Sequence, residues 1–226
     1  SLVMDRWGGS SNLTRVSQLG AVGGLVRPGS EWSANPTEME QWPGYGRNVA
    51  ANRAEAKRLL KEAGVENLTF TLTNRNHQPY VTAGIFLIDQ LRQIGVKVED
   101  RQLELSGWYA AQSSGDFEAM IDSFTQFSDD PTNVLVKYIS TDRAPEVSVS
   151  RHTDRELDAL FDKQAATVDK AERLKLVRAF EKRLFDESYA VPILWWQRIV
   201  VMNARVRGWS MSPTHMIYQD LADVWL

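Results

Sequence analysis

The sequence contains no cysteine among its 226 residues. This absence excludes disulfide bonds, cysteine-ligated metal centres and thiol catalysis. Histidine is scarce as well, because the only three are His77, His152 and His215, and no two of them stand at the spacing of a metal-binding motif. We therefore expect neither a structural zinc site nor a resident cofactor.

Long apolar runs and a strong charge of one sign are also missing. No apolar run reaches the roughly 18 residues that a transmembrane helix needs. The net charge of −3 gives no support to nucleic acid as a partner. The motifs G-x-S-x-G, G-x-x-x-x-G-K-[ST] and G-x-G-x-x-G are absent, so the enzyme classes built on them are not indicated.

The clearest pattern that is present lies between residues 54 and 105. Apolar residues at helical spacing predict one helix that ends at Gly64 and a second that begins at Pro79 and ends at Gly95. Each is followed by a strand pattern, and the first, residues 68–73, alternates strictly and predicts a half-buried strand. A strand, a helix and a strand over this length build parallel sheet, so we expect an α/β fold.

The sequence patterns of the remaining segments are less regular. Residues 1–50 are rich in Gly, Ser, Pro and Asn, which indicates irregular structure with one helix around residues 13–19. We expect a short helix over residues 106–114, a third strand over residues 117–124, and a short helix over residues 134–139.

Two further helices have clear start signals. Thr153 and Asp169 each stand three residues before a glutamate, which is the spacing of a capping box. After them, residues 190–202 are strand-like, although Pro192 restricts the start to an edge or a crossover. Residues 207–226 show no periodicity.

The order of these segments is specific. AEAKRLLKEAG, a strand, QLRQIGVKVE, a tryptophan, GDFEAMIDSFTQFSDDPT, two helices and VPILWW follow one another along the whole chain. This order resembles the large extracytoplasmic solute-binding proteins of ABC importers, the oligopeptide/dipeptide/nickel-binding family (family 5). Asp5 and Arg6 resemble the family's Asp-Arg pair near the start of its C-terminal lobe. The resemblance implies a periplasmic-binding-protein-like α/β lobe (type II, C-terminal lobe), with a mixed sheet flanked by helices, in a non-catalytic binding protein.

Family members are usually more than twice this long. The resemblance therefore implies that residues 1–195 form the C-terminal ligand-binding lobe, and that residues 196–226 form a tail that crosses back to the N-terminal lobe. The opening SLVMDRWGGSSN has no signal-peptide pattern, so we expect a longer precursor that carries one, and a periplasmic or extracytoplasmic location. The implied partners are a small-molecule solute (a peptide, an opine, or a sugar-like or aromatic compound), the membrane permease of an ABC importer, and the N-terminal lobe.

The resemblance also implies candidate binding residues. In peptide-binding members a tryptophan before the G-D-F strand lines the ligand chamber, and Trp108 resembles it; a core tryptophan on a short helix is the alternative. The strand then ends in W-x-x-D, whose Asp binds the peptide's α-amino group, but here Phe124 and Phe127 stand at the Trp and Asp positions. An unpaired buried ammonium costs several kcal/mol. We therefore expect no ordinary peptide bound through its amino terminus, unless Asp129 or Asp130 replaces the missing carboxylate.

The expected solute instead presents an apolar, aromatic, opine or sugar-like face to Phe124 and Phe127, with hydrogen bonds from Thr125 and Gln126; a small aromatic core at the end of the sheet is the alternative. The weaker candidates are Trp195, Trp196, Gln197 and Trp32. Strand alternation points Trp195 and Trp196 to opposite faces, so at most one faces a cleft. Trp32 lies in a loop, where it would either reach the cleft rim or pack on the surface.

Two other functions stay open at this stage. Asp122, Asp129 and Asp130 contain the carboxylate pair that a hydrolase would need. Acidic residues beside a turn proline are more typical of turns and helix caps. The same fold could also serve a sensor that feeds a receptor rather than a permease.

Overall fold

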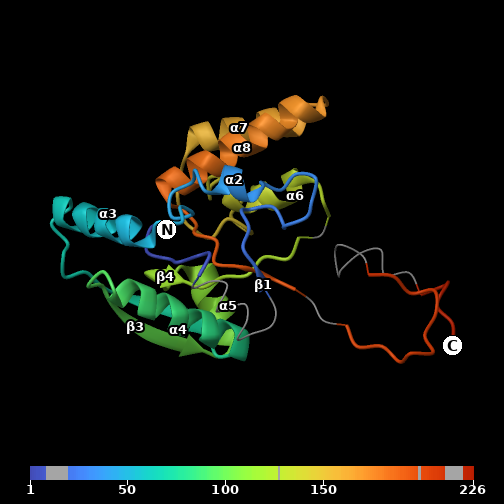
Figure 1. Ribbon diagram of the computed structural model, residues 1–226, viewed down its shortest axis with the longest axis horizontal. Coiled ribbons are helices and arrows are strands. Elements are labelled where there is room, and N and C mark those ends of the chain that lie inside the picture. Colours follow the sequence, from blue (N-terminus) through green and yellow to red (C-terminus); the bar gives the residue numbers. More distant parts are fainter. Residues whose placement is uncertain (9–19, 127, 198–199, 212–220) are drawn as a thin grey trace.

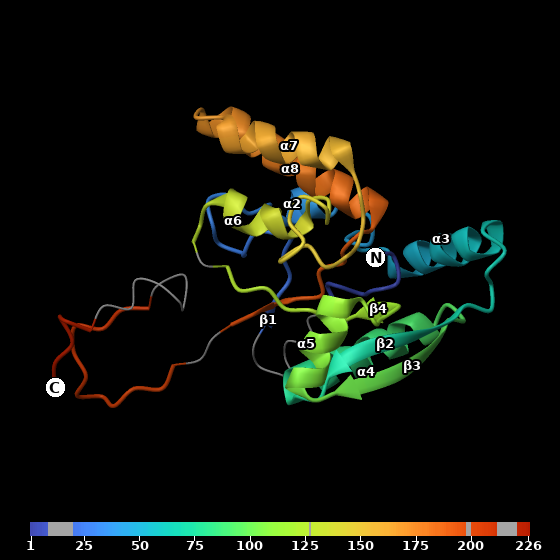
Figure 2. The same cartoon turned by 180° about the vertical axis from the view of Figure 1, so that it is seen from behind.

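The computed structural model describes residues 1–8, 20–126, 128–197, 200–211 and 221–226. Figure 1 shows an α/β part below a helical part, and residues 200–211 and 221–226 extending away from both; the view from behind in Figure 2 agrees. The helix expected around residues 13–19, and Phe127, lie outside the described residues. Among the helices that the structure describes, none has both the length and the apolar character to cross a membrane.

The α/β part is built on a parallel three-stranded sheet with the order β3-β2-β4. Its strands are β2 (Thr69–Arg75), β3 (Lys97–Leu103) and β4 (Ala119–Met120). Thr69 pairs with Lys97 and Leu72 pairs with Ala119. The expected strand–helix–strand unit is confirmed, and antiparallel pairing occurs in a separate sheet described below.

The helices of this part end where the glycines predict. Helix α3 (Val49–Glu62) is followed by Gly64 with φ 70°, and α4 (Gln78–Arg92) by Gly95 with φ 91°. Helix α5 (Leu105–Ser114) covers the segment expected to be helical and ends at Gly115. Glycine adopts a positive φ without a steric penalty, so these positions stop the helices and turn the chain towards the next strand.

Strand β2 is more buried than its alternating pattern predicts. Leu72, Thr73 and Asn74 are all buried in succession, so the half-buried interpretation is wrong for the second half of the strand. Both α4 and α5 pack on β2. The buried Asn74 is satisfied because its amide donates to the carbonyl of Tyr80 at 2.8 Å.

Strand β4 is much shorter than the strand expected over residues 117–124. The ladder continues for one more bond, from the Ile121 amide to the Thr73 carbonyl at 3.0 Å. The next amide, that of Ser123, donates instead to the carboxylate of Asp122 at 2.7 Å. A side chain has thus taken the donor that the sheet would have used, and the chain leaves the sheet here.

The helical part contains several short helices, with the two long helices α7 (Arg155–Ala166) and α8 (Lys170–Glu187) lying side by side above them in Figure 1. Its short elements are α2 (Pro36–Met39), α6 (Pro131–Leu135) and the 3₁₀ helix η1 (Val136–Tyr138). Val177, Phe180 and Leu184 of α8 are fully buried, as their spacing predicts. They pack with Trp42, Tyr45 and Phe185, and the rings of Trp42 and Phe185 are 4.9 Å apart.

The start of α7 corrects one prediction. Thr153 is exposed, and the N-cap is Asp154, whose carboxylate accepts from the amides of Glu156 and Leu157 and pairs with Arg183 at 2.7 Å. A carboxylate can accept several hydrogen bonds and a cation at once, which a threonine hydroxyl cannot. Asp169 caps α8 as expected, through the amide of Glu172.

A second sheet is formed by two strands that are far apart in the sequence, β1 (Gly20–Ala21) and β5 (Trp195–Trp196). Strand β1 pairs antiparallel with β5, which is only a small piece of the strand expected over residues 190–202. Pro192 has no amide to donate, and its carbonyl accepts from the buried guanidinium of Arg6 at 2.8 Å. The segment that leads into β5 is thus held by a side-chain hydrogen bond as well as by its two residue pairs with β1.

Candidate functional site

A pocket of about 160 Å³ lies where α5, the end of β4 and η1 meet. A loop that connects η1 to α7, residues 141–152, forms its remaining wall. The residues that line the pocket are Trp108, Tyr109, Gln112, Asp122, Ser123, Phe124, Lys137, Glu146, Val147 and Val149. Two of the predicted site residues, Trp108 and Phe124, are therefore brought together.

The aromatic side of the pocket is set by helix α5. Trp108 faces the sheet, is only 3% exposed, and donates its indole N–H to the carbonyl of Ile121 at 3.3 Å. Tyr109, one position on, points outward and is 54% exposed, with its ring 5.0 Å from that of Trp108. Trp108 is thus both a core residue and part of the pocket lining.

The polar side of the pocket is organised around an ion pair. The ammonium of Lys137 on η1 contacts the carboxylate of Asp122, and the two side chains are 14% and 19% exposed. Gln112 of α5 donates to the same carboxylate at 2.9 Å. The Lys137 ammonium also lies 5.5 Å from the centre of the Phe124 ring. This pair joins η1 to the end of β4 beneath the pocket.

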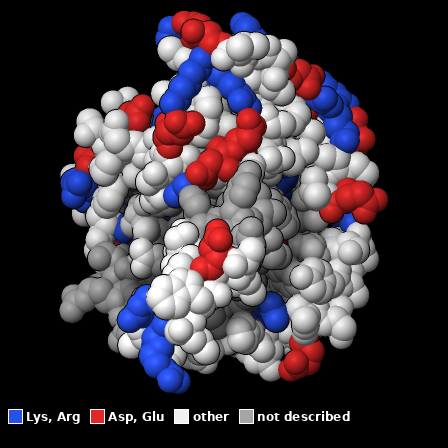
Figure 3. All heavy atoms as spheres, turned by 90° about the vertical axis from the view of Figure 1, so that its right-hand side faces the viewer, with Lys and Arg blue, Asp and Glu red and all other residues white. Residues whose placement is uncertain are grey.

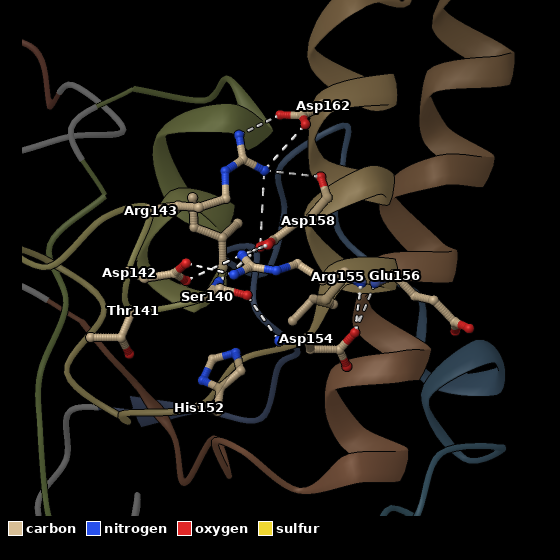
Figure 4. A network of polar contacts seen from close by, with 12 residues as sticks. Ser140, Thr141, Asp142, Arg143, His152, Asp154, Arg155, Glu156, Asp158 and Asp162 are labelled. Atoms are coloured by element: carbon tan, nitrogen blue, oxygen red, sulfur yellow. Dashed lines mark hydrogen bonds and ion pairs between the residues drawn. The ribbon is translucent and has the colours of Figure 1, made fainter.

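The 141–152 loop is closed at its base and fastened to helix α7. The amide of Thr141 donates to the carbonyl of His152 at 3.0 Å. Figure 4 shows the polar network that holds this region against α7. Its contacts include Ser140 with Asp154 and Asp158, Asp142 with Arg155, and Arg143 with Asp162. The network gives the wall of the pocket a defined position.

His152 lies beside this network and is stacked on Tyr189. Its ring lies 4.1 Å from that of Tyr189, and its Nε2 contacts the carbonyl of Tyr138 at 3.1 Å. Burial lowers the pKa of His152. The neutral ring, which donates from Nε2 and accepts from the Ser150 hydroxyl at Nδ1, fits all of these contacts.

Gln126, a predicted ligand contact, is occupied by another part of the protein. It is 6% exposed, its carbonyl accepts from the amide of Arg27 at 3.2 Å, and its amide donates to Asp129 at 3.0 Å. The Arg27 guanidinium closes the group with two bonds to Asp129. Thr125 is half-buried beside it and does not line the pocket.

The three acidic residues of the hydrolase hypothesis have three different cationic partners. Asp122 pairs with Lys137, Asp129 with Arg27, and Asp130 with Arg173. Asp130 also caps α6 through the amide of Thr132. Burial raises the pKa of Asp130, but the bonds from Arg173 and Thr132 outweigh it and lower the pKa below the usual range. These are the roles of structural carboxylates, and the geometry gives the hydrolase no support.

The two tryptophans of β5 point to different surroundings, as strand alternation predicts. Trp195 donates to the carbonyl of Gly24 at 2.8 Å, on the helical side. Trp196 is 40% exposed, and its ring lies 5.1 Å from Tyr80, which in turn is 6.3 Å from Trp108. Trp108, Tyr80 and Trp196 thus form an aromatic row. Tyr80 was not predicted as a site residue, because it follows the proline at the start of a helix and belongs to no motif.

The remaining candidates lie away from the pocket. Gln197 is exposed. Trp32 is 8% exposed in the core of the helical part, with the Arg173 guanidinium 5.1 Å from its ring. Across the described residues, no group of three or more potential metal ligands is gathered. On the face shown in Figure 3, acidic and basic side chains are interspersed.

Comparison with known proteins connects this architecture to one family. Residues 21–146 match the family model of the bacterial extracellular solute-binding proteins, family 5, middle region. Di/tripeptide-binding protein 4 of Pseudomonas aeruginosa is 27% identical over 165 residues, which are 70% of this chain and 31% of that protein. Heme-binding protein A of Haemophilus influenzae is 24% identical over 193 residues, 82% of this chain and 34% of that protein.

A solved structure shows the same fold. The Escherichia coli murein tripeptide binding protein MppA aligns with 87% of this chain and 38% of its own, with a TM-score of 0.74 at 18% identity. The expected periplasmic-binding-protein fold is thereby confirmed. The chain spans about a third of the length of the curated relatives it matches.

Proposed function

The chain belongs to family 5 of the bacterial extracellular solute-binding proteins, and we propose that it is the C-terminal ligand-binding lobe of such a receptor, which serves an ABC importer. In this proposal residues 1–195 form the lobe, and an N-terminal lobe supplies the other side of the cleft. The solute is captured when the lobes close by hinge motion, outside the cytoplasm, and is then delivered to a membrane permease.

The observation that carries the proposal is the pocket beside Trp108 and Phe124. It combines aromatic rings with a few fixed polar groups, which is the usual composition of a small-molecule site. The pocket is bordered by elements from both parts of the lobe, so its shape depends on the whole fold. An aromatic row continues from it through Tyr80 to Trp196.

The solute is proposed not to be an ordinary peptide held through its amino terminus. Phe127 stands where the peptide-binding pattern has its aspartate. The two carboxylates that could replace it, Asp129 and Asp130, are each engaged by an arginine. Removing either carboxylate from its arginine would leave a partly buried cation unpaired. The named ligands of the two relatives, di/tripeptides and heme, differ widely and indicate no single class of solute. Since neither of these two carboxylates is available for a peptide amino group, the candidates are opines, sugar-like solutes and aromatic solutes.

The test is a thermal-shift screen of the full-length protein against peptides, opines, sugars and aromatic acids, followed by calorimetry on each hit. We expect at least one non-peptide class to bind, and Phe124→Ala to weaken that binding about tenfold, or 1.4 kcal/mol. Phe161→Ala, a truncation in the helical part away from the pocket, serves as the control. No binding by any class, or equal affinity in Phe124→Ala with folding intact, would overturn the proposal.

A further inference from the structure

The buried indole and the one ammonium of the pocket are already engaged by the protein. The indole N–H of Trp108 donates to the Ile121 carbonyl, and the Gln112 amide donates to Asp122. The only basic side chain in the lining, Lys137, is paired with the same carboxylate. An anionic solute would therefore have to compete with Asp122 for the one cationic side chain of the lining.

Of the two carboxylates in the lining, Asp122 is paired with Lys137, and Glu146 has no cationic partner in the part of the chain that the structure describes. Glu146 is exposed, and it takes part in none of the ion pairs found among the described residues. Its loop is fixed on both sides of the pocket, because Asp142 pairs with Arg155 of α7 and Arg151 donates to the Ser113 carbonyl of α5 at 3.3 Å. The loop thus places Glu146 at the pocket wall, and among the described residues its carboxylate has no counter-ion.

The aromatic rings of the lining, like Glu146, favour a positively charged solute. The faces of Tyr109 and Phe124 carry the negative side of the ring quadrupole, which attracts ammonium and guanidinium groups. Phe124 already has the Lys137 ammonium 5.5 Å from its centre, whereas Tyr109 is more than half exposed. With Asp122 and Lys137 cancelling, the formal charge that remains in the pocket is that of Glu146.

We propose that this pocket receives a positively charged organic end group, an ammonium or guanidinium on an apolar or aromatic stem, and that Glu146 is the residue that selects it. The proposal rests on the receptor function proposed above and names the class of solute. The volume of about 160 Å³ is close to that of an engineered cavity of about 150 Å³ that binds one benzene molecule. It therefore holds an end group, and the rest of the solute extends along the cleft.

The first test compares three probes that share a phenyl ring and differ in charge: 2-phenylethylammonium, 2-phenylethanol and 3-phenylpropionate. Calorimetry on the full-length protein should rank the ammonium tightest, at least tenfold tighter than the carboxylate, with an affinity that falls as salt is raised. Equal binding, tighter binding of the carboxylate, or no measurable binding of the ammonium would overturn the inference.

Two variants locate the effect. Glu146→Gln should weaken the ammonium probe about tenfold and leave the alcohol unchanged, whereas Glu99→Gln, on the exposed strand β3, should change neither. Asp122→Asn should release Lys137 and shift the preference towards the carboxylate. If the solute screen succeeds but Glu146→Gln has no effect on the ammonium probe, this inference fails alone. If no class binds in that screen, the receptor proposal fails.

Discussion

Glu181 of α8 is fully buried and supports the backbone that leads from strand β1. Its carboxylate accepts from the amide of Leu25 at 3.0 Å and from the Arg178 guanidinium at 2.9 Å. Burial raises the pKa of Glu181 to about 7, against the lowering effect of Arg178. The carboxyl group of Glu181 therefore binds its proton more tightly in the folded state than in the unfolded state.

The sign of the resulting pH dependence follows directly. Between the unfolded pKa of 4.5 and the folded value of about 7, the folded state binds more protons than the unfolded state. The free energy of unfolding therefore decreases as the pH is raised from about 4.5 to about 7. The span is on the order of 3 kcal/mol. We expect urea unfolding at pH 5 and pH 7.5 to show this loss in the wild type and much less of it in Glu181→Gln. Parallel pH profiles for the two proteins would contradict the assignment.

At the residue scale, sequence reasoning located part of the site. Trp108 and Phe124 were found through a family pattern, and both line the pocket. Lys137 and Glu146 were missed because they lie on a 3₁₀ helix and a loop without a motif, and only the fold brings them to Trp108. Gln126 was chosen for its hydrogen-bonding groups, but those groups bind Arg27 and Asp129. Sequence gives the chemistry of a side chain but not which neighbour uses it.

At the scale of single elements, helix α7 offers a sharp comparison between two adjacent residues. Asp154 caps the helix and pairs with Arg183, whereas Thr153 is exposed. Asp154→Ala should lower the free energy of unfolding by about 2 kcal/mol, because it removes the helix cap and one of the two carboxylates that pair with the partly buried Arg183, the other being Glu156. Thr153→Ala should change it by less than about 0.5 kcal/mol. Urea denaturation of both variants checks this, and a larger loss in Thr153→Ala would contradict the capping geometry.

Periodic elements were predictable and short ones were not. Helices α3, α4, α5 and α8, and strands β2 and β3, follow from apolar spacing, and α3, α4 and α5 are each followed by a glycine with positive φ. Strands β4 and β5 fall short of their patterns because competing bonds decide their length. Asp122 takes the amide of Ser123, and the carbonyl of Pro192 accepts from Arg6. The first bond joins neighbouring residues and the second joins residues 186 positions apart, and strand periodicity reveals neither of them.

At the scale of the whole molecule, the C-terminal residues stand apart from the lobe. Val201, Trp225 and Leu226 are 91%, 63% and 80% exposed. Arg207 and Trp225 pair with each other in an antiparallel bridge. Large apolar side chains left in water indicate a surface that another part of the protein covers. We propose that residues 196–226 pack on the N-terminal lobe.

This proposal predicts opposite results in two contexts. Ending the 226-residue chain at Gln197 should change its free energy of unfolding by less than about 0.5 kcal/mol, because the exposed apolar side chains bury little surface on this lobe. The same truncation in the full-length protein should lower its stability and weaken solute binding at least tenfold, because the tail would link the two lobes that enclose the solute. Urea unfolding and calorimetry measure both effects. A loss above about 1 kcal/mol in the isolated chain would show that the tail packs on this lobe instead.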